Sequence, residues 1–198
     1  MSQGLALTPT GDIAEHVVGE AVNIVLNGER KVFMERVHVK ETDLEFVKEL
    51  ETRSATDMIV IHHTGSGADN DIDASAEQIH GWHINNGWAG IGYHYVVRKN
   101  GTIERGRPHW VVGSHAYGEN WHTIGIHLSG DFTIASPTQD QIEAAAMLIA
   151  NVCTDYGIPI DRDHIVGHRD IGESSCPGNV LYDMLDTIIG KAIWYQEQ

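Results

Sequence analysis

The stretch MIVIHHTGSG, residues 58–67, gives the clearest structural signal in the sequence. Four apolar residues follow one another without the alternation of a half-exposed strand, a pattern typical of a strand buried on both faces. The run ends in two histidines and a glycine-rich polar segment, which predicts that the strand leads into a loop. The pair His62 and His63 therefore stands at a strand end, where side chains can contribute to a site.

Strands and helices alternate downstream of this strand. The apolar patterns predict strands over residues 93–97 and 123–128, and helices over residues 75–85, 139–156 and 179–194. Ser75 is a suitable N-cap for the first helix, and Pro137-Thr138 opens the long second helix. Such alternation predicts an α/β fold with a central mixed β-sheet flanked by helices.

The segment before residue 53 has a different character. Asn27-Gly28 separates two apolar runs, residues 21–26 and 31–34, and this dipeptide favours the tight turn of a β-hairpin. Leu44, Val47 and Leu50 have helical spacing, which predicts a short helix over residues 42–52. We therefore divide the chain into an N-terminal extension of unknown role, residues 1–52, and a main domain, residues 53–198.

Composition narrows the function classes. An apolar fraction of 41% and a charged fraction of 21% are ordinary for a soluble globular protein. The net charge of −15 argues against nucleic acid as a partner, because phosphate contacts depend on lysine and arginine. No apolar run approaches the roughly 20 residues that span a bilayer. The first residues lack a signal-peptide pattern, so we expect synthesis in the cytoplasm.

A metal site is the strongest chemical hypothesis. His168 and Cys176 lie eight residues apart on one predicted loop, and imidazole with thiolate is a typical zinc donor set. A third donor would come from the pair His62-His63. Three protein ligands with one open position are typical of a catalytic zinc ion. Taken singly, His168 also fits an ordinary loop histidine, and Cys176 also fits a small buried hydrophobe.

Four segments together resemble the type 2 N-acetylmuramoyl-L-alanine amidases, the superfamily of phage lysozyme-type amidases and peptidoglycan recognition proteins. They are IVIHHT at 59–64, GYHYVV at 92–97, GSHA at 113–116 and GHRDIGESSCPG at 167–178. Their order and separation also match, and the resemblance covers about residues 56–190. The family implies a mixed sheet flanked by helices and one zinc ion per chain, so residues 53–198 are identified as a zinc amidase domain.

The resemblance implies a role for each matching residue. His62, His168 and Cys176 correspond to the three zinc ligands. Tyr93 corresponds to the tyrosine whose hydroxyl lies beside the catalytic water. His63 is the neighbour that strand alternation turns away from the metal, so we expect a packing or supporting role for it.

Three further residues depart from, or extend, the family pattern. Ser174 stands where the best-known phage members have lysine, and its hydroxyl is the expected hydrogen-bond donor to a developing oxyanion. His127 stands where some branches have an acidic residue, and it fits either a proton carrier or a buried strand histidine. His115 lies in a segment that resembles part of the cleft wall, which fits either substrate contact or a structural role.

Aromatic residues in the predicted loops suggest a groove for a long polar substrate. Stacking on sugar or peptide is expected chiefly of Trp88 and Trp121, with Trp110, His115 and Tyr117 nearby in sequence. Ordinary packing is the alternative for each of them.

The expected function is zinc-dependent hydrolysis of the amide bond between N-acetylmuramic acid and L-alanine in bacterial peptidoglycan. The setting we expect is a phage or prophage endolysin that reaches the cell wall after release through a holin pore. The alternatives are a cytosolic wall-recycling amidase and a non-catalytic peptidoglycan-recognition module. The sequence does not indicate an oligomeric state.

Overall fold

A computed structural model of the chain describes residues 21–26, 29–34, 36–65 and 72–197. Near the N-terminus, β1 (Ala21–Leu26) and β2 (Glu29–Met34) pair antiparallel as a separate two-stranded sheet. This confirms the strands of the predicted hairpin, and the Asn27-Gly28 turn lies outside the described residues. The boundary between extension and main domain at residue 52 stays a prediction.

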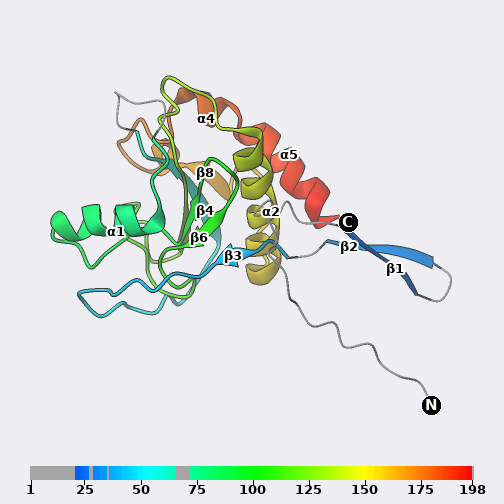
Figure 1. The fold of residues 1–198 in the computed structure, drawn as a ribbon, viewed down its shortest axis with the longest axis horizontal. Helices are drawn as coiled ribbons and strands as arrows, with labels where there is room; N and C mark the ends of the chain where they lie inside the picture. Colours follow the sequence, from blue (N-terminus) through cyan, green and yellow to red (C-terminus); the bar gives the residue numbers. More distant parts are fainter. Residues whose placement is uncertain (1–20, 27–28, 35, 66–71, 198) are drawn as a thin grey trace, which may run out of the picture.

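A six-stranded mixed sheet forms the centre of the protein (Figure 1). Its spatial order is β3-β6-β5-β7-β4-β8, in which only the β5–β6 pair is antiparallel. The strands are β3 (Val39–Lys40), β4 (Met58–His63), β5 (Tyr95–Val97), β6 (Ile103–Arg105), β7 (Thr123–Leu128) and β8 (Ile165–Gly167). The predicted α/β class with a mixed sheet is confirmed.

Helices cover both faces of this sheet, with α1 on one side and the adjacent pair α2 and α5 on the other (Figure 1). The helices are α1 (Ala76–Asn85), α2 (Gln139–Tyr156), α3 (His168–Ile171), α4 (Asn179–Asp183) and α5 (Leu185–Gln196). Ser75 and Thr138 cap α1 and α2 through reciprocal capping boxes, which explains why both helices begin where predicted. The helix predicted over 179–194 is divided at Met184. Among the described residues, no helix is both long and apolar enough to span a membrane.

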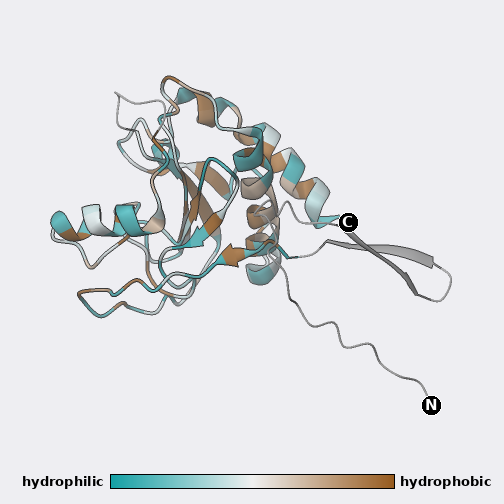
Figure 2. Ribbon diagram, viewed as in Figure 1, coloured by the Kyte–Doolittle hydropathy of each residue, from teal (hydrophilic) through white to brown (hydrophobic). Residues whose placement is uncertain are grey.

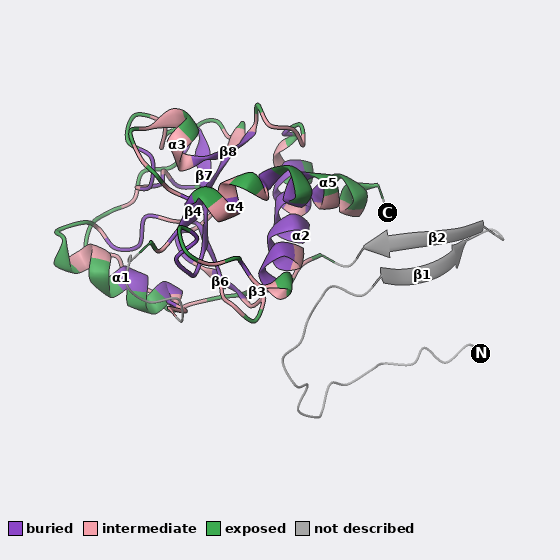
Figure 3. Cartoon of the chain, turned by 90° about the horizontal axis from the view of Figure 1, so that it is seen from above, coloured by how far each residue is buried: buried purple, intermediate pink, exposed green. Residues whose placement is uncertain are grey.

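The two faces of the sheet differ in chemistry. Ile59 and Ile61 of β4 pack with Ile126 of β7 against buried residues of α2 and α5, which form the larger apolar core. The central strands carry hydrophobic residues, whereas α1 is mostly hydrophilic (Figure 2). Burial is concentrated along the sheet and α2, and α1 keeps an exposed outer face (Figure 3). Strand alternation directs His62 and His127, register partners on β4 and β7, to the face opposite this core. The polar face thus carries the candidate site.

The helix predicted over residues 42–52 is wrong, because this segment is irregular backbone lying against the main domain. Val47 donates its N–H to Ala89 O, and Glu51 O accepts the N–H of Val112. Leu44 packs on the smaller apolar cluster beneath α1, while Val47 is 58% exposed. The apolar spacing predicted a helix with local i→i+4 hydrogen bonds, but this segment instead forms hydrogen bonds and packing contacts with other segments.

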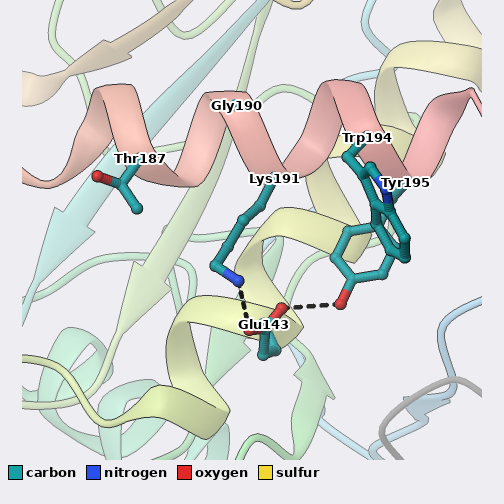
Figure 4. A pocket seen from close by; sticks show the side chains of 6 residues that line it. All are labelled: Glu143, Thr187, Gly190, Lys191, Trp194 and Tyr195. Carbon is teal, nitrogen blue, oxygen red and sulfur yellow. Dashed lines mark hydrogen bonds and ion pairs between the residues drawn. The ribbon is translucent and has the colours of Figure 1, made fainter.

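A cavity of about 580 Å³ is lined by Glu143 of α2 and by residues 187–195 of α5 (Figure 4). Glu143 of α2 accepts from Lys191 Nζ at 2.6 Å and from the Tyr195 hydroxyl at 2.7 Å. Burial alone would raise the pKa of Glu143, but these bonds lower it below its ordinary value. The carboxylate therefore joins the two helices as an anion.

Candidate metal centre

Three potential metal ligands meet at the carboxyl edge of the parallel strands. His62 is the second-to-last residue of β4, His168 follows the neighbouring strand β8 directly, and Cys176 lies in the loop after α3. One donor atom from each residue lies within 4.8 Å of the other two. Because parallel strands end at the same edge, residues more than 100 positions apart in sequence converge there.

The donor set fits a zinc ion. Cys176 Sγ lies 3.7 Å from His62 Nδ1. A tetrahedral zinc with ordinary Zn–S and Zn–N bonds holds these two atoms about 3.6 Å apart. Burial raises the pKa of Cys176 to about 11 and lowers that of His62 well below 6.5, so neither group carries charge alone at neutral pH. A bound cation would stabilise the thiolate and accept the neutral imidazole lone pair.

Backbone hydrogen bonds fix the loop that carries Cys176. Its carbonyl accepts the N–H of Arg169 at 2.9 Å, and its own N–H donates to Ser174 Oγ at 3.1 Å. The His63 N–H points at Cys176 Sγ, 3.4 Å away. The His63 ring turns to the other face, where its Nδ1 accepts from Phe132 N–H at 3.2 Å. This placement fits the supporting role expected of His63.

Gly178 holds the end of this loop against the core, and we expect Gly178→Ala to weaken metal binding. Its φ of 84° is left-handed, and a Cβ there would lie 2.4 Å from the Phe132 carbonyl carbon. The strain should cost about 1–3 kcal/mol and displace Cys176. Zinc competition against a chromophoric chelator would measure the loss. Gly190→Ala, where a Cβ meets nothing within 4 Å, is the control, and equal affinity for both variants would contradict this account.

Tyr93 lies beside the ligand cluster with its hydroxyl uncommitted. Its ring centroid is 5.0 Å from that of His62 and 4.8 Å from that of His127. Within residues 36–65 and 72–197, the hydroxyl makes no hydrogen bond. Burial, with a smaller effect from Cys176, raises the pKa of Tyr93 well above 10. Tyr93 therefore lies beside the cluster as a protonated hydrogen-bond donor.

His127 lies behind Tyr93 and is 1% exposed. Its Nε2 lies 3.2 Å from the hydroxyl of Thr64, which also accepts the N–H of Gly130. Its Nδ1 has no hydrogen-bond partner among the described residues. Of the two alternatives from sequence, a buried strand histidine matches this position better than a carrier that meets solvent or substrate.

His115 and the two tryptophans differ in accessibility. His115 is 8% exposed and its Nδ1 lies 3.0 Å from His62 Nε2. It therefore contacts the potential zinc ligand His62 and does not line an open substrate groove. Trp88 is 41% exposed and its ring lies 4.5 Å from that of His83, next to Tyr93. Trp121 is 55% exposed and its ring lies 4.4 Å from the His122 ring; within the described part of the chain it makes no ring contact with the ligand cluster.

Sequence reasoning missed the residues that support these groups. Asn120 Oδ1 accepts the N–H groups of His115 and Ala116, and Thr123 Oγ1 lies 3.4 Å from His115 Nε2. His83 Nδ1 accepts the N–H of Gly92, which fixes the backbone immediately before Tyr93. No spacing signal in the sequence distinguishes these polar residues from ordinary loop and helix positions.

Buried neutral histidines should make the metal-free protein sensitive to acid. Burial, then repulsion from His63 and His83, lowers the pKa of His127 to about 3, against an ordinary value of 6.5. As pH falls, the His127 imidazole is therefore protonated in the unfolded state before it is protonated in the folded state. The contribution of neutral His127 to the free energy of unfolding is present above about pH 6.5 and is lost as pH falls towards 3. By pH 5 the loss for His127 alone is about 2 kcal/mol.

Urea unfolding of chelator-treated protein at pH 7 and pH 5 would measure this loss. The His127→Leu variant carries no such group and should lose less stability over the same interval. An identical loss in wild type and variant would refute the assignment of this acid sensitivity to His127.

Comparison with known proteins identifies the family of this chain. The family model described as N-acetylmuramoyl-L-alanine amidase matches residues 52–179. An endolysin of Klebsiella phage KP32 is 30% identical over 130 residues, which cover 63% of this chain and 82% of that protein. The chain belongs to the N-acetylmuramoyl-L-alanine amidase family.

Solved structures give the same result. The endolysin amidase LysCS from Clostridium intestinale superposes with a TM-score of 0.70 at 32% identity, covering 79% of this chain and 97% of that one. Peptidoglycan recognition protein LE, solved with tracheal cytotoxin, a monomeric diaminopimelic acid-type peptidoglycan, gives 0.62 at 26% identity, covering 73% and 87%. Amidase-type endolysins and peptidoglycan recognition proteins therefore share this fold.

Proposed function

We propose that this protein is a zinc-dependent amidase that cuts peptidoglycan between the lactyl group of N-acetylmuramic acid and L-alanine. One observation carries the proposal: His62, His168 and Cys176 place three donors within 4.8 Å of one another, beside Tyr93, whose hydroxyl bonds to none of the described residues. Three protein ligands leave a tetrahedral metal one open position, which is what hydrolysis requires and a structural site lacks. Membership of the amidase family supports the same reaction.

The metal and Tyr93 would have different roles in the reaction. Zinc, when bound, supplies a Lewis acid that polarises the scissile carbonyl and promotes ionisation of water. The Tyr93 hydroxyl, uncommitted and protonated, donates to the carbonyl oxygen as negative charge develops there. Its ring is held between His62 and His127, so the hydroxyl is oriented before substrate arrives.

Ser174 contributes through the ligand loop. Its Oγ accepts the N–H of Cys176, which leaves the hydroxyl proton available for a further bond. The serine thus helps to hold Cys176 in place, and its hydroxyl proton is available as the proposed donor to the oxyanion. It carries no fixed positive charge, so Tyr93 supplies more of the stabilisation than in relatives with lysine at this position.

Substrate contact is proposed for the exposed aromatic surface next to Tyr93. Trp88 packs on His83, and His83 in turn lies 5.6 Å from Tyr93. A half-exposed indole packed on the histidine that neighbours Tyr93 suits stacking on a sugar ring of the glycan. Trp121, which lies near His122, would contact a more distant part of the same polymer.

The chemistry of the cut tests this proposal. Purified peptidoglycan treated with the protein should gain new alanine amino termini without new reducing sugar ends, and a zinc chelator should stop the reaction. New reducing ends, or alanine termini that form equally in chelator, would refute a zinc amidase.

A peptidoglycan-recognition module without catalysis is the alternative. The presence of both histidines, Cys176 and Tyr93 favours the enzyme, since the three ligands would hold a catalytic metal and Tyr93 would stabilise the oxyanion, whereas a module that only binds the polymer has no use for a hydrolytic metal. Binding to peptidoglycan without any cleavage, by protein that contains zinc, would establish the alternative.

We further propose that the protein acts as an endolysin, made in the cytoplasm and released to the wall through a holin pore. The similarity to a phage endolysin over 63% of the chain supports this setting. Expression inside bacteria should cause lysis only when a holin is expressed as well. Lysis without holin would require another export route, and a preference for free wall fragments over intact wall would favour recycling.

A further inference from the structure

A chain of hydrogen bonds extends from His62 into the protein, away from the proposed metal. His62 Nε2 lies 3.0 Å from His115 Nδ1, and both rings are buried, with exposures of 1% and 8%. His115 Nε2 lies 3.4 Å from Thr123 Oγ1. Thr123 in turn donates its hydroxyl proton to the carbonyl of Glu119 at 2.8 Å.

These contacts determine where the protons lie. Because the Thr123 hydroxyl donates to Glu119, its oxygen is left to accept from His115 Nε2–H. A neutral His115 with its proton on Nε2 has a lone pair on Nδ1, which accepts a proton from His62 Nε2. The lone pair of His62 is then on Nδ1, the atom 3.7 Å from Cys176 Sγ.

We propose that His115 is a positioning residue, which holds His62 in the single tautomer and ring orientation that presents Nδ1 to zinc. The inference rests on the proposed function only in taking zinc as the metal. It reassigns His115 from contact with substrate to support of a ligand. Partners of this kind orient metal-bound histidines and raise their basicity, and their loss typically weakens metal affinity 10- to 100-fold.

The surrounding backbone is shaped to hold this ring. A Cβ on Gly113 would lie 2.4 Å from the His115 ring, and a Cβ on Gly125 would lie 2.6 Å from it. The two glycines therefore form a slot that any other residue would fill. Asn120 fixes the open end by accepting the backbone N–H groups of His115 and Ala116 at 2.8 and 2.9 Å.

Zinc affinity of His115 variants tests the proposal without relying on catalysis. Asparagine can place its Oδ1 near the position of the imidazole Nδ1 and still accept from His62, whereas leucine cannot. Chelator competition should show zinc binding about 10- to 100-fold weaker in His115→Leu, and restored to within about threefold of wild type in His115→Asn. Thr123→Val, which is nearly isosteric, removes the acceptor of His115 Nε2–H and should give an intermediate loss.

The tautomer provides a second readout that a purely structural role would not change. In metal-free wild type, nitrogen-15 NMR of the imidazoles should show His62 protonated at Nε2 alone. In His115→Leu, or in Thr123→Val if the first variant does not fold, His62 should become a mixture of tautomers. Wild-type zinc affinity in folded His115→Leu, or His62 protonated at Nδ1 in wild type, would overturn the proposal. If wild type itself bound no zinc, the proposed function would fail first.

Discussion

Replacing Cys176 by serine should remove zinc and abolish amide cleavage. Serine keeps the shape of the side chain, but its hydroxyl does not ionise at neutral pH and is a poor zinc ligand. Metal catalysis of hydrolysis is worth several kcal/mol, so we expect the rate to fall by about three orders of magnitude or more. Zinc content of the purified variant and release of alanine amino termini would be measured together.

Cys153 provides the matched control for this substitution. It is the other cysteine of the chain, is 1% exposed within α2 and belongs to the apolar core. Cys153→Ser should therefore lower stability while keeping zinc and activity. Full activity in Cys176→Ser, or equal zinc loss in both variants, would contradict the assignment of Cys176 as a ligand.

Removing the Tyr93 hydroxyl should slow catalysis without releasing the metal. Tyr93→Phe keeps the ring contacts with His62 and His127 and deletes only the donor. Loss of one well-aimed donor to an oxyanion typically lowers kcat by about 10²–10³. Steady-state kinetics should show that loss in kcat with KM and zinc content close to wild type.

Tyr195 of α5, whose hydroxyl donates to Glu143, is the control for a tyrosine hydroxyl on another part of the protein. Tyr195→Phe should leave kcat unchanged. A Tyr93→Phe enzyme with wild-type kcat would show that Tyr93 only packs against His62, the alternative that its position in an aromatic cluster allows.

Much of the fold could be predicted because local signals agreed with tertiary structure. The strand at 58–63 and the helix at 139–156 have the bounds that their apolar runs and cap residues indicate. The short strands β3 and β8 could not be predicted, since two or three residues carry too little periodicity. The prediction of a helix over 42–52 was wrong for the opposite reason. The apolar spacing suited a helix, but the backbone groups of this segment form hydrogen bonds with other parts of the chain.

The site was predictable to the extent that it lies on recognisable motifs. His62, His168 and Cys176 stand on such motifs, and the structure brings them together. The burial of His115 and its bond to His62 were not predictable, because they depend on Gly125 of β7 lying under the ring. Sequence spacing predicts where a residue lies along a strand or loop. The contact of His115 with His62 and Gly125 joins segments that become neighbours only when the sheet folds.

The central claim is that zinc held by His62, His168 and Cys176 drives cleavage of the peptidoglycan amide bond. Returning zinc in measured amounts to chelator-stripped protein, while recording release of alanine amino termini from purified peptidoglycan, tests it most directly. Activity should rise linearly and reach a plateau at one equivalent of zinc per chain. Cleavage that proceeds without zinc, or no cleavage once one equivalent is bound, would contradict the account.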